Sequence, residues 1–272
     1  MERTNTFVVE GNQALWKLGN DCARLWNELN FERRQAYIRY NKFSWYPKSL
    51  HEKYASIIGS ATVQQIMNKN NEAWKSLSLK RLGRQGKCVS MPRYWKRNGK
   101  RELRIIVRND CYRLKKGFLK LPKGLRLRIK GKLKWIGKQG RLEIIYDGVD
   151  EAWRGFMAVK LEKLSRREGN KPLYIDLGVI NLATLRLQGL KNPIAYSGKT
   201  ILAEWWYWNK RIEKEQSRLA RVNNAKASIK LRRFYRIRQR RFRHAINAMV
   251  KAIVEDAYRL GVSEIILGNL NF

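Results

Sequence analysis

The stretch K-P-L-Y-I-D-L-G-V-I-N-L-A-T-L, from Lys171 to Leu185, decides how the rest of this chain is interpreted. Its apolar run carries one acid, Asp176, and Gly178 follows where the backbone can approach a ligand or take a conformation that a side chain forbids. One interpretation is a carboxylate at the exposed end of a central strand, placed to bind a divalent cation. The other is an Asp that ends the strand or caps a turn.

The charge balance points to a polyanionic partner. The 272 residues carry 59 Lys plus Arg against 22 Asp plus Glu, a formal net charge of +37, while 44% of the residues are apolar. Because self-repulsion of this size stabilises no compact domain, we expect a partner whose condensed counterions are released on binding, and nucleic acid is the first candidate. A membrane surface ranks lower, because the basic residues are spread along the chain and no apolar run of about 18 residues accompanies them.

The start of the chain and its cysteines bear on the compartment. The opening M-E-R-T-N-T-F has no basic segment followed by an apolar one, which predicts a cytoplasmic protein without a signal peptide. Cys22, Cys88 and Cys111 form no C-x-x-C pair and fit a reduced compartment. We therefore expect them to pack in the core rather than to bind zinc.

The first third of the chain predicts a short strand and then a helical unit. Thr6 to Glu10 is β-branched, and Gly11 and Asn12 follow it as a helix start. A second helix is predicted from about Ser60. From Gln13 onward apolar residues recur at spacings of three and four, at Leu15, Leu18, Cys22, Leu25 and Leu29.

After residue 85 the apolar period changes from that of a helix to that of a strand. Short segments divided by glycines, Leu133 to Trp135 among them, predict a small antiparallel barrel or sandwich. In Leu125 to Lys130 the cations Arg126, Arg128 and Lys130 alternate with apolar residues, which gives a half-buried strand with a positive outer face. An ordinary solvated face is the alternative.

A long basic helix is predicted over residues 226–260, and no acidic residue occurs from Gln216 to Val254. One arc of this helix is apolar, and an opposing arc presents guanidinium groups that can bind phosphates in directed contacts. Charged faces that are merely solvated generally mix signs. Arg238 lies inside the apolar arc and requires a buried acceptor that the sequence does not name. The arginine arc consists of Arg232, Arg233, Arg236, Arg240 and Arg243.

The aromatic run Trp205 to Trp208 precedes that helix on another predicted helix. Such rings can serve as platforms on which bases stack. A cluster of this kind more often packs in a helix core, and both interpretations stay open from the sequence.

The segment from Tyr174 to Thr184 resembles the first RuvC motif of the TnpB (OrfB) proteins of bacterial and archaeal insertion sequences, which are relatives of the compact type V CRISPR nucleases. The resemblance implies an RNA-guided DNA endonuclease in which Asp176 is catalytic and binds Mg²⁺. It also implies a guide-like structured RNA and target DNA as partners.

The resemblance further implies an α+β multi-domain fold, in which a small antiparallel β-barrel with an inserted helical unit precedes an incomplete RNase H-like (RuvC) α/β domain. Residues 1–10 and 85–165 would form the β-barrel (wedge-like) domain and 11–84 the inserted helical recognition domain. The partial RuvC domain would span residues 171–272.

Two features depart from the family pattern. The strand that matches Glu264 to Leu267 is commonly followed by a Glu, whereas this chain has Gly268 and Asn269. The zinc ribbon and the last acid of the family are missing, and one aspartate cannot build a site for two divalent ions. We therefore expect an amino-terminal two thirds of such a protein, truncated before the zinc ribbon and inactive alone. The alternatives are a catalytically dead, repressor-like RNA- and DNA-binding protein and a general basic RNA-binding protein.

Overall fold

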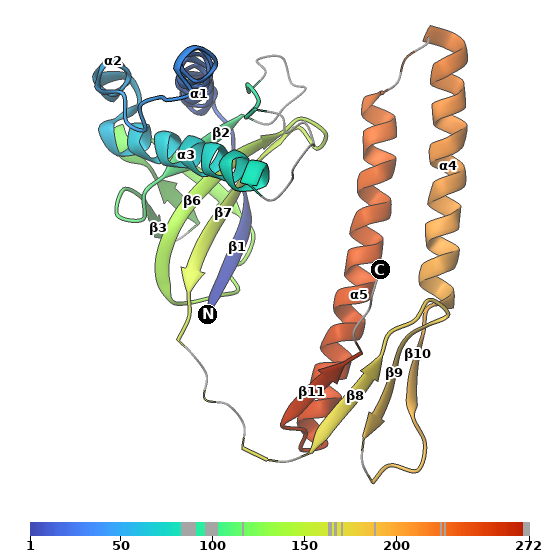
Figure 1. The fold of residues 1–272 in the computed structure, drawn as a ribbon. Helices are drawn as coiled ribbons and strands as arrows, with labels where there is room; N and C mark the ends of the chain where they lie inside the picture. The colour runs from blue at the N-terminus through green and yellow to red at the C-terminus, as the bar shows by residue number, and fades with distance from the viewer. Residues whose placement is uncertain are drawn as a thin grey trace. The chain divides into compact units, whose positions relative to one another are not determined.

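The computed structural model divides the chain into two compact units, Met1–Lys163 and Leu164–Phe272, which are described one at a time (Figure 1). In the described ranges no helix is both long and apolar enough to cross a membrane. The residues described are 1–82, 91–95, 103–115, 117–162, 165, 168–169, 171–187, 189–223, 225 and 227–268, with the side chains of 77–82 and 223 left aside.

The first unit is built on a seven-stranded sheet in the order β2-β6-β7-β1-β5-β4-β3. Its first strand in sequence, β1, lies in the middle and pairs antiparallel with β7 and β5. The strands are β1 (Glu2–Val9), β2 (Arg104–Val107), β3 (Arg113–Lys115), β4 (Phe118–Lys120), β5 (Arg126–Lys130), β6 (Lys138–Asp147) and β7 (Ala152–Lys160), with a 3₁₀ turn at Pro122–Gly124.

Two details differ from the barrel expected for this unit. The short edge strands β2 and β3 do not pair with each other, so no pairing among the described strands closes the sheet. Leu133 to Trp135, predicted as a strand, lies in the loop between β5 and β6. The side chain of Asn5 takes the backbone hydrogen bonds of this loop that a neighbouring strand would otherwise take.

Helices α1 (Gln13–Tyr40) and α3 (Ser60–Leu82) pack against this sheet, and α2 (Lys48–Ile58) packs on those two helices. Asn12 caps α1 by accepting a hydrogen bond from the backbone N–H of Leu15 at 2.9 Å. The sequence predicts α1 and α3, but not α2, which follows Pro47 and buries only a narrow stripe. The buried stripe of α2 joins the same core as the predicted apolar stripe of α1. It consists of Leu50, Tyr54 and Ile58.

A buried cation fixes α1 against α3. Arg33 is 2% exposed, donates to the side-chain oxygen of Asn71 at 2.6 Å and to the backbone oxygen of Trp45 at 2.7 Å, and also bonds Asn70. Burial lowers the pKa of Arg33 to about 10. The guanidinium therefore stays charged at neutral pH, solvated by amide and carbonyl oxygens instead of by a carboxylate.

The second unit holds a four-stranded sheet in the order β10-β9-β8-β11. Its strands β8, β9 and β10 run antiparallel, whereas β11 lies parallel to β8. A parallel pair needs a crossover connection, and the helices α4 (Lys199–Asn223) and α5 (Ile229–Arg259) supply it. The strands are β8 (Pro172–Asp176), β9 (Asn181–Leu187), β10 (Ile194–Ser197) and β11 (Glu264–Leu267).

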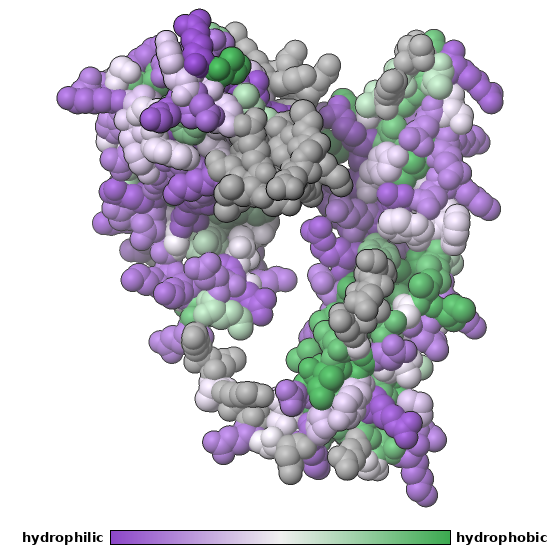
Figure 2. Space-filling view, viewed as in Figure 1, coloured by the Kyte–Doolittle hydropathy of each residue, from purple (hydrophilic) through white to green (hydrophobic). Residues whose placement is uncertain are grey.

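The C-terminal half of α5 covers one face of this sheet, and the first part of α5 pairs with α4 as a helical hairpin (Figure 1). Ile253 and Ala257 of α5 pack with Leu173 and Ile175 of β8. Figure 2 shows an apolar patch over β11, whose Ile265 and Leu267 are 41% and 58% exposed. Because no other described residue covers these side chains, β11 presents an exposed apolar surface.

Candidate nucleic-acid interface

The predicted arginine arc forms one row along α5. Each residue of a helix advances about 100° around the axis, so Arg232, Arg236 and Arg243 lie within about 40° of one another, with Arg233 and Arg240 beside them. Arg232 and Arg243 are exposed and form no ion pair within the described parts of the chain. The row therefore concentrates positive charge along one side of the helix, the arrangement that attracts a row of phosphates.

The opposite side of α5 faces α4, and two further arginines lie there. Arg238 places its guanidinium 4.2 Å from the ring centroid of Trp205 and 5.1 Å from that of Tyr235, and it hydrogen-bonds the side-chain oxygen of Asn209. Asn209 is thus the acceptor that the sequence left unnamed. The cation is held between aromatic faces and an amide, so its role lies in the hairpin rather than in the exposed row.

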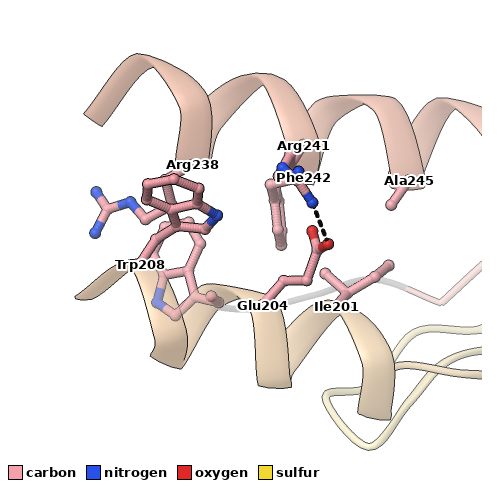
Figure 3. A pocket seen from close by; sticks show the side chains of 8 residues that line it. Ile201, Glu204, Trp208, Arg238, Arg241, Phe242 and Ala245 are labelled. Atoms are coloured by element: carbon pink, nitrogen blue, oxygen red, sulfur yellow. Dashed lines mark hydrogen bonds and ion pairs between the residues drawn. The ribbon is translucent and has the colours of Figure 1, made fainter. Parts of the chain in front are cut away.

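Arg241 also turns toward α4, where it donates to the carboxylate of Glu204 at 2.7 Å (Figure 3). Ile201, Trp208, Phe242 and Ala245 pack around this pair. The cavity left between them measures about 10 Å³, which is room for no more than a single water. The enclosed gap is therefore an interhelical contact with no room for a ligand, and a more open hollow lies beside it, lined by Arg240, Arg241 and His244 among others.

The aromatic run of α4 divides between the two interpretations. Trp205 contacts Phe242 with ring centroids 5.3 Å apart, and Trp208 contacts Phe234 at 5.8 Å, so both pack against α5. Trp206 and Tyr207 point away and are 62% and 53% exposed. Trp205 and Trp208 are three residues apart and share one face of α4, whereas Trp206 and Tyr207 lie on another face. Treating the four residues as one cluster misses this division.

In the first unit, the cations of β5 lie on the exposed face as the alternation predicts, with Leu127 buried between them. The guanidinium of Arg126 lies 4.0 Å from the ring centroid of Phe118 on the neighbouring strand, and that of Arg128 lies 6.0 Å away. Lys130 forms an ion pair with Glu10 at 3.0 Å. Arg126 and Arg128 are thus held ready for an anion, whereas the charge of Lys130 is partly offset.

Asp176 is the last residue of β8 and is exposed. Its register partner on β9 is Thr184, and β11 runs parallel on the other side with Leu267 opposite Ile175. This register brings Gly268 beside Asp176, and the Gly268 N–H donates to the backbone oxygen of Ile175 at 3.2 Å. The place next to Asp176 where a second acid would complete a metal site is therefore held by a residue without a side chain.

Glu264 does not fill this gap. It pairs with Pro172 at the other end of β8. Strands rise about 3.3 Å per residue, so Glu264 lies about 13 Å along the sheet from Asp176. Across the described residues no three His, Cys, Asp or Glu side chains gather where they could hold a metal ion.

The family described as "Probable transposase" (OrfB_IS605) matches residues 156–271, which include β8, α4, α5 and β11. The TnpB-like protein ORF457 of Acidianus two-tailed virus is 32% identical over 295 residues, covering 94% of this chain and 64% of the relative.

Among solved structures, the chain is similar to the protein of a Cas12f1–sgRNA–target DNA complex determined by cryo-EM. The TM-score is 0.53 at 14% identity, over 94% of this chain and 64% of that one. This likeness supports the fold, and the chain spans 64% of the length of both relatives.

Fold and sequence together define a basic, transposase-related α/β protein. Its sequence is similar to the TnpB/OrfB proteins, through the matched family over residues 156–271 and through ORF457 over most of the chain.

Proposed function

We propose that this chain is the nucleic-acid-binding part of a TnpB/OrfB-like, RNA-guided DNA endonuclease, with a guide-like structured RNA and target DNA as its partners. The arginine row of α5 is the observation that carries the proposal. Its members share one side of a helix whose other side is occupied by α4 and the sheet. The solved relative was determined with a guide RNA and target DNA, which supports the same two partners here.

The strand arrangement of the second unit supports a domain assignment. We assign the second unit to a partial RNase H-like (RuvC) domain over residues 171–272, because three antiparallel strands and one parallel strand are joined through a helical crossover. Residues 1–10 and 85–165 would be the barrel-like wedge domain, and residues 11–84 would be its inserted helical domain. We expect the protein to be cytoplasmic. The junction at 84 and 85 lies outside the described residues.

Mg²⁺ is the cofactor that the family implies, with Asp176 as its catalytic ligand. The described residues do not fit such a site: Gly268 adjoins Asp176, and Glu264 lies at the far end of the strand. No cleavage step can be derived from this arrangement. We assign Asp176 an architectural role at the end of β8 here, and metal-dependent cleavage to a protein that supplies further acids.

A general basic RNA-binding protein is the second candidate, since the net charge of +37 alone would bind many RNAs. Sequencing the nucleic acid that co-purifies with the chain separates the two. The proposal predicts one discrete RNA that overlaps the 3′ end of the protein's own gene. Cellular RNAs recovered in proportion to their abundance would contradict guide binding and support the general binder.

A further inference from the structure

The loop between β5 and β6, residues 131–137, is held in one conformation by a buried side chain. Asn5 of β1 is 1% exposed. Its side-chain oxygen accepts from the backbone N–H of Lys134 at 2.8 Å and of Trp135 at 3.0 Å, and its amide donates to the backbone oxygen of Trp135 at 2.8 Å. These three bonds fix the middle of a segment that has no strand partner.

Glycines at both ends of the loop are required by its path. Gly131 has φ +123°, a conformation that side chains rarely adopt. At Gly137 a Cβ atom would lie 2.6 Å from the backbone oxygen of Lys160. The loop therefore holds one conformation in the free protein. Its conformational entropy is lost on folding, so little more is lost when a ligand binds.

The fixed loop displays an apolar tip. Ile136 is 93% exposed, whereas Leu133 and Trp135 are 40% and 38% exposed. The guanidinium of Arg3 lies 5.3 Å from the Trp135 ring centroid and supports the indole from the sheet side. Trp135 thus partly caps the unit, and Ile136 projects beyond it. A single exposed apolar residue is ordinary, but here it stands on a backbone that is fixed at three points.

Cations surround the tip. Lys132, Lys134 and Lys138 are exposed, and none of them forms an ion pair with another described residue. The sequence from Gly131 to Arg141 contains no acid. An apolar residue among cations fits a nucleic acid, because phosphates can meet the lysines while the apolar side chain contacts an unstacked base.

We propose that residues 131–137 form a wedge that packs Ile136 against an unstacked nucleobase, at a helix end or a single-stranded step, while the three lysines contact the flanking phosphates. This wedge belongs to the first unit, whereas the α5 row belongs to the second. It rests on the proposed function only in taking nucleic acid as the partner.

Fluorescence anisotropy with the full chain tests the wedge, using labelled single-stranded RNA, hairpin RNA, single-stranded DNA and blunt duplex DNA of matched sequence. Ile136→Ser should weaken binding about tenfold on the probes that offer an unstacked base, because the apolar contact to that base is lost. The salt dependence should not change, because no charge is lost. Lys134→Gln should instead reduce the slope of log K against log salt by about 0.7 to 0.9. The RNA and DNA probes show which nucleic acid supplies the base.

Ile38→Ser is the matched control, because Ile38 is an exposed isoleucine of the same unit at 67%. Ile136→Ser and Ile38→Ser should melt at the same temperature as the parent. Affinities for Ile136→Ser equal to those of the control on every probe would overturn the wedge while leaving nucleic-acid binding intact. If Ile136→Ser lost binding to anionic phospholipid vesicles but kept the parental affinity for nucleic acid, the wedge proposal would be overturned in favour of a lipid surface. A parent chain that binds none of the four probes would overturn the proposed function as well.

Discussion

The guanidinium of Arg238 lies 4.2 Å from the ring centroid of Trp205, so a cation of α5 is stacked on an aromatic ring of α4 in the middle of the hairpin. The same group reaches Asn209 one turn further along α4. A planar, delocalised cation can make both contacts at once. The two helices are therefore aligned by an arginine whose charge is used inside the protein, which leaves the exposed row on the other side of α5 for a ligand.

Replacing Arg238 should destabilise the hairpin without removing a phosphate contact. We expect Arg238→Lys to lower the free energy of unfolding by about 1 kcal/mol and Arg238→Ala by about 2 kcal/mol, since a cation–π contact and a hydrogen bond are lost. Urea unfolding followed by circular dichroism measures this. Arg232→Lys, at an exposed position of the row, is the control and should change stability little. Equal stabilities for Arg238→Lys and the control would show that the stacking contributes nothing.

Asp176 should not contribute to RNA affinity. Its carboxylate is exposed at the end of β8 and would repel phosphates rather than bind them. We expect Asp176→Ala to bind single-stranded RNA within about twofold of the parent chain in anisotropy titrations. A loss of more than tenfold, with an unchanged far-ultraviolet circular dichroism spectrum, would mean that Asp176 positions the RNA.

A carboxylate at position 268 should create a cation site beside Asp176, where the described residues hold none. A Cβ atom at Gly268 would meet only the backbone oxygen of Ile175, at 4.0 Å, so a side chain fits beside Asp176. Gly268→Asp is expected to raise Mn²⁺ affinity at least about tenfold, because hard divalent cations favour clustered carboxylates. Calorimetric titration measures the affinity.

Two further variants control the Mn²⁺ experiment. Gly268→Asn has the same shape without the charge and should bind Mn²⁺ as the parent does. Adding Asp176→Asn to Gly268→Asp should abolish the gain. A gain that survives without Asp176 would show that the two positions do not face one site.

Acid should loosen the hairpin through Glu215. Its side chain is 4% exposed and accepts from Arg218 at 2.7 Å, and it forms an ion pair with Lys230 of α5 at 3.1 Å. The hydrogen bonds from Arg218, followed by those of Lys230, hold the pKa of Glu215 at about 2, below the ordinary value of 4.5. The stabilisation of the folded hairpin by the ionised Glu215 carboxylate is therefore complete above about pH 4.5, and it is lost as the pH falls toward about 2.

Thermal melting of the parent and of Glu215→Gln across that range tests the prediction. The parent should melt at the higher temperature near neutral pH, and the difference should shrink steadily below about pH 4.5. A difference that stays constant down to about pH 2 would contradict the lowered pKa.

Local patterns in the sequence predict the elements that carry the candidate site. Asp176 ends a strand, the cations of β5 alternate outward, and α5 is one long helix with the five arginines of the predicted row on one side. These features depend on periods of two or 3.6 residues, which a sequence states directly. The α5 helix begins at Ile229, where Ser228 caps it, instead of at 226.

Features that depend on distant partners escape such patterns. The acceptor of Arg238 belongs to another helix, and the loop at Trp135 is fixed by Asn5, 130 residues earlier in the chain. Leu133 to Trp135 alternates like a strand, yet a side chain supplies the hydrogen bonds that a strand would have made. Two features of the sequence could have indicated the loop. Gly131 and Gly137 stand at its ends, and Asn5 alternates with the apolar residues Phe7 and Val9 of β1.

The salt dependence of RNA binding tests the arginine row most directly. Log K for a single-stranded RNA would be measured against log salt for the parent chain and for a variant with Arg232, Arg236 and Arg243 changed to Gln, with Arg259→Gln on another side of α5 as the control. If each arginine of the row contacts a phosphate, the triple variant should lose about two from the slope, and Arg259→Gln should lose almost nothing. A triple variant that keeps the parental slope would contradict the assignment of this row as the nucleic-acid interface.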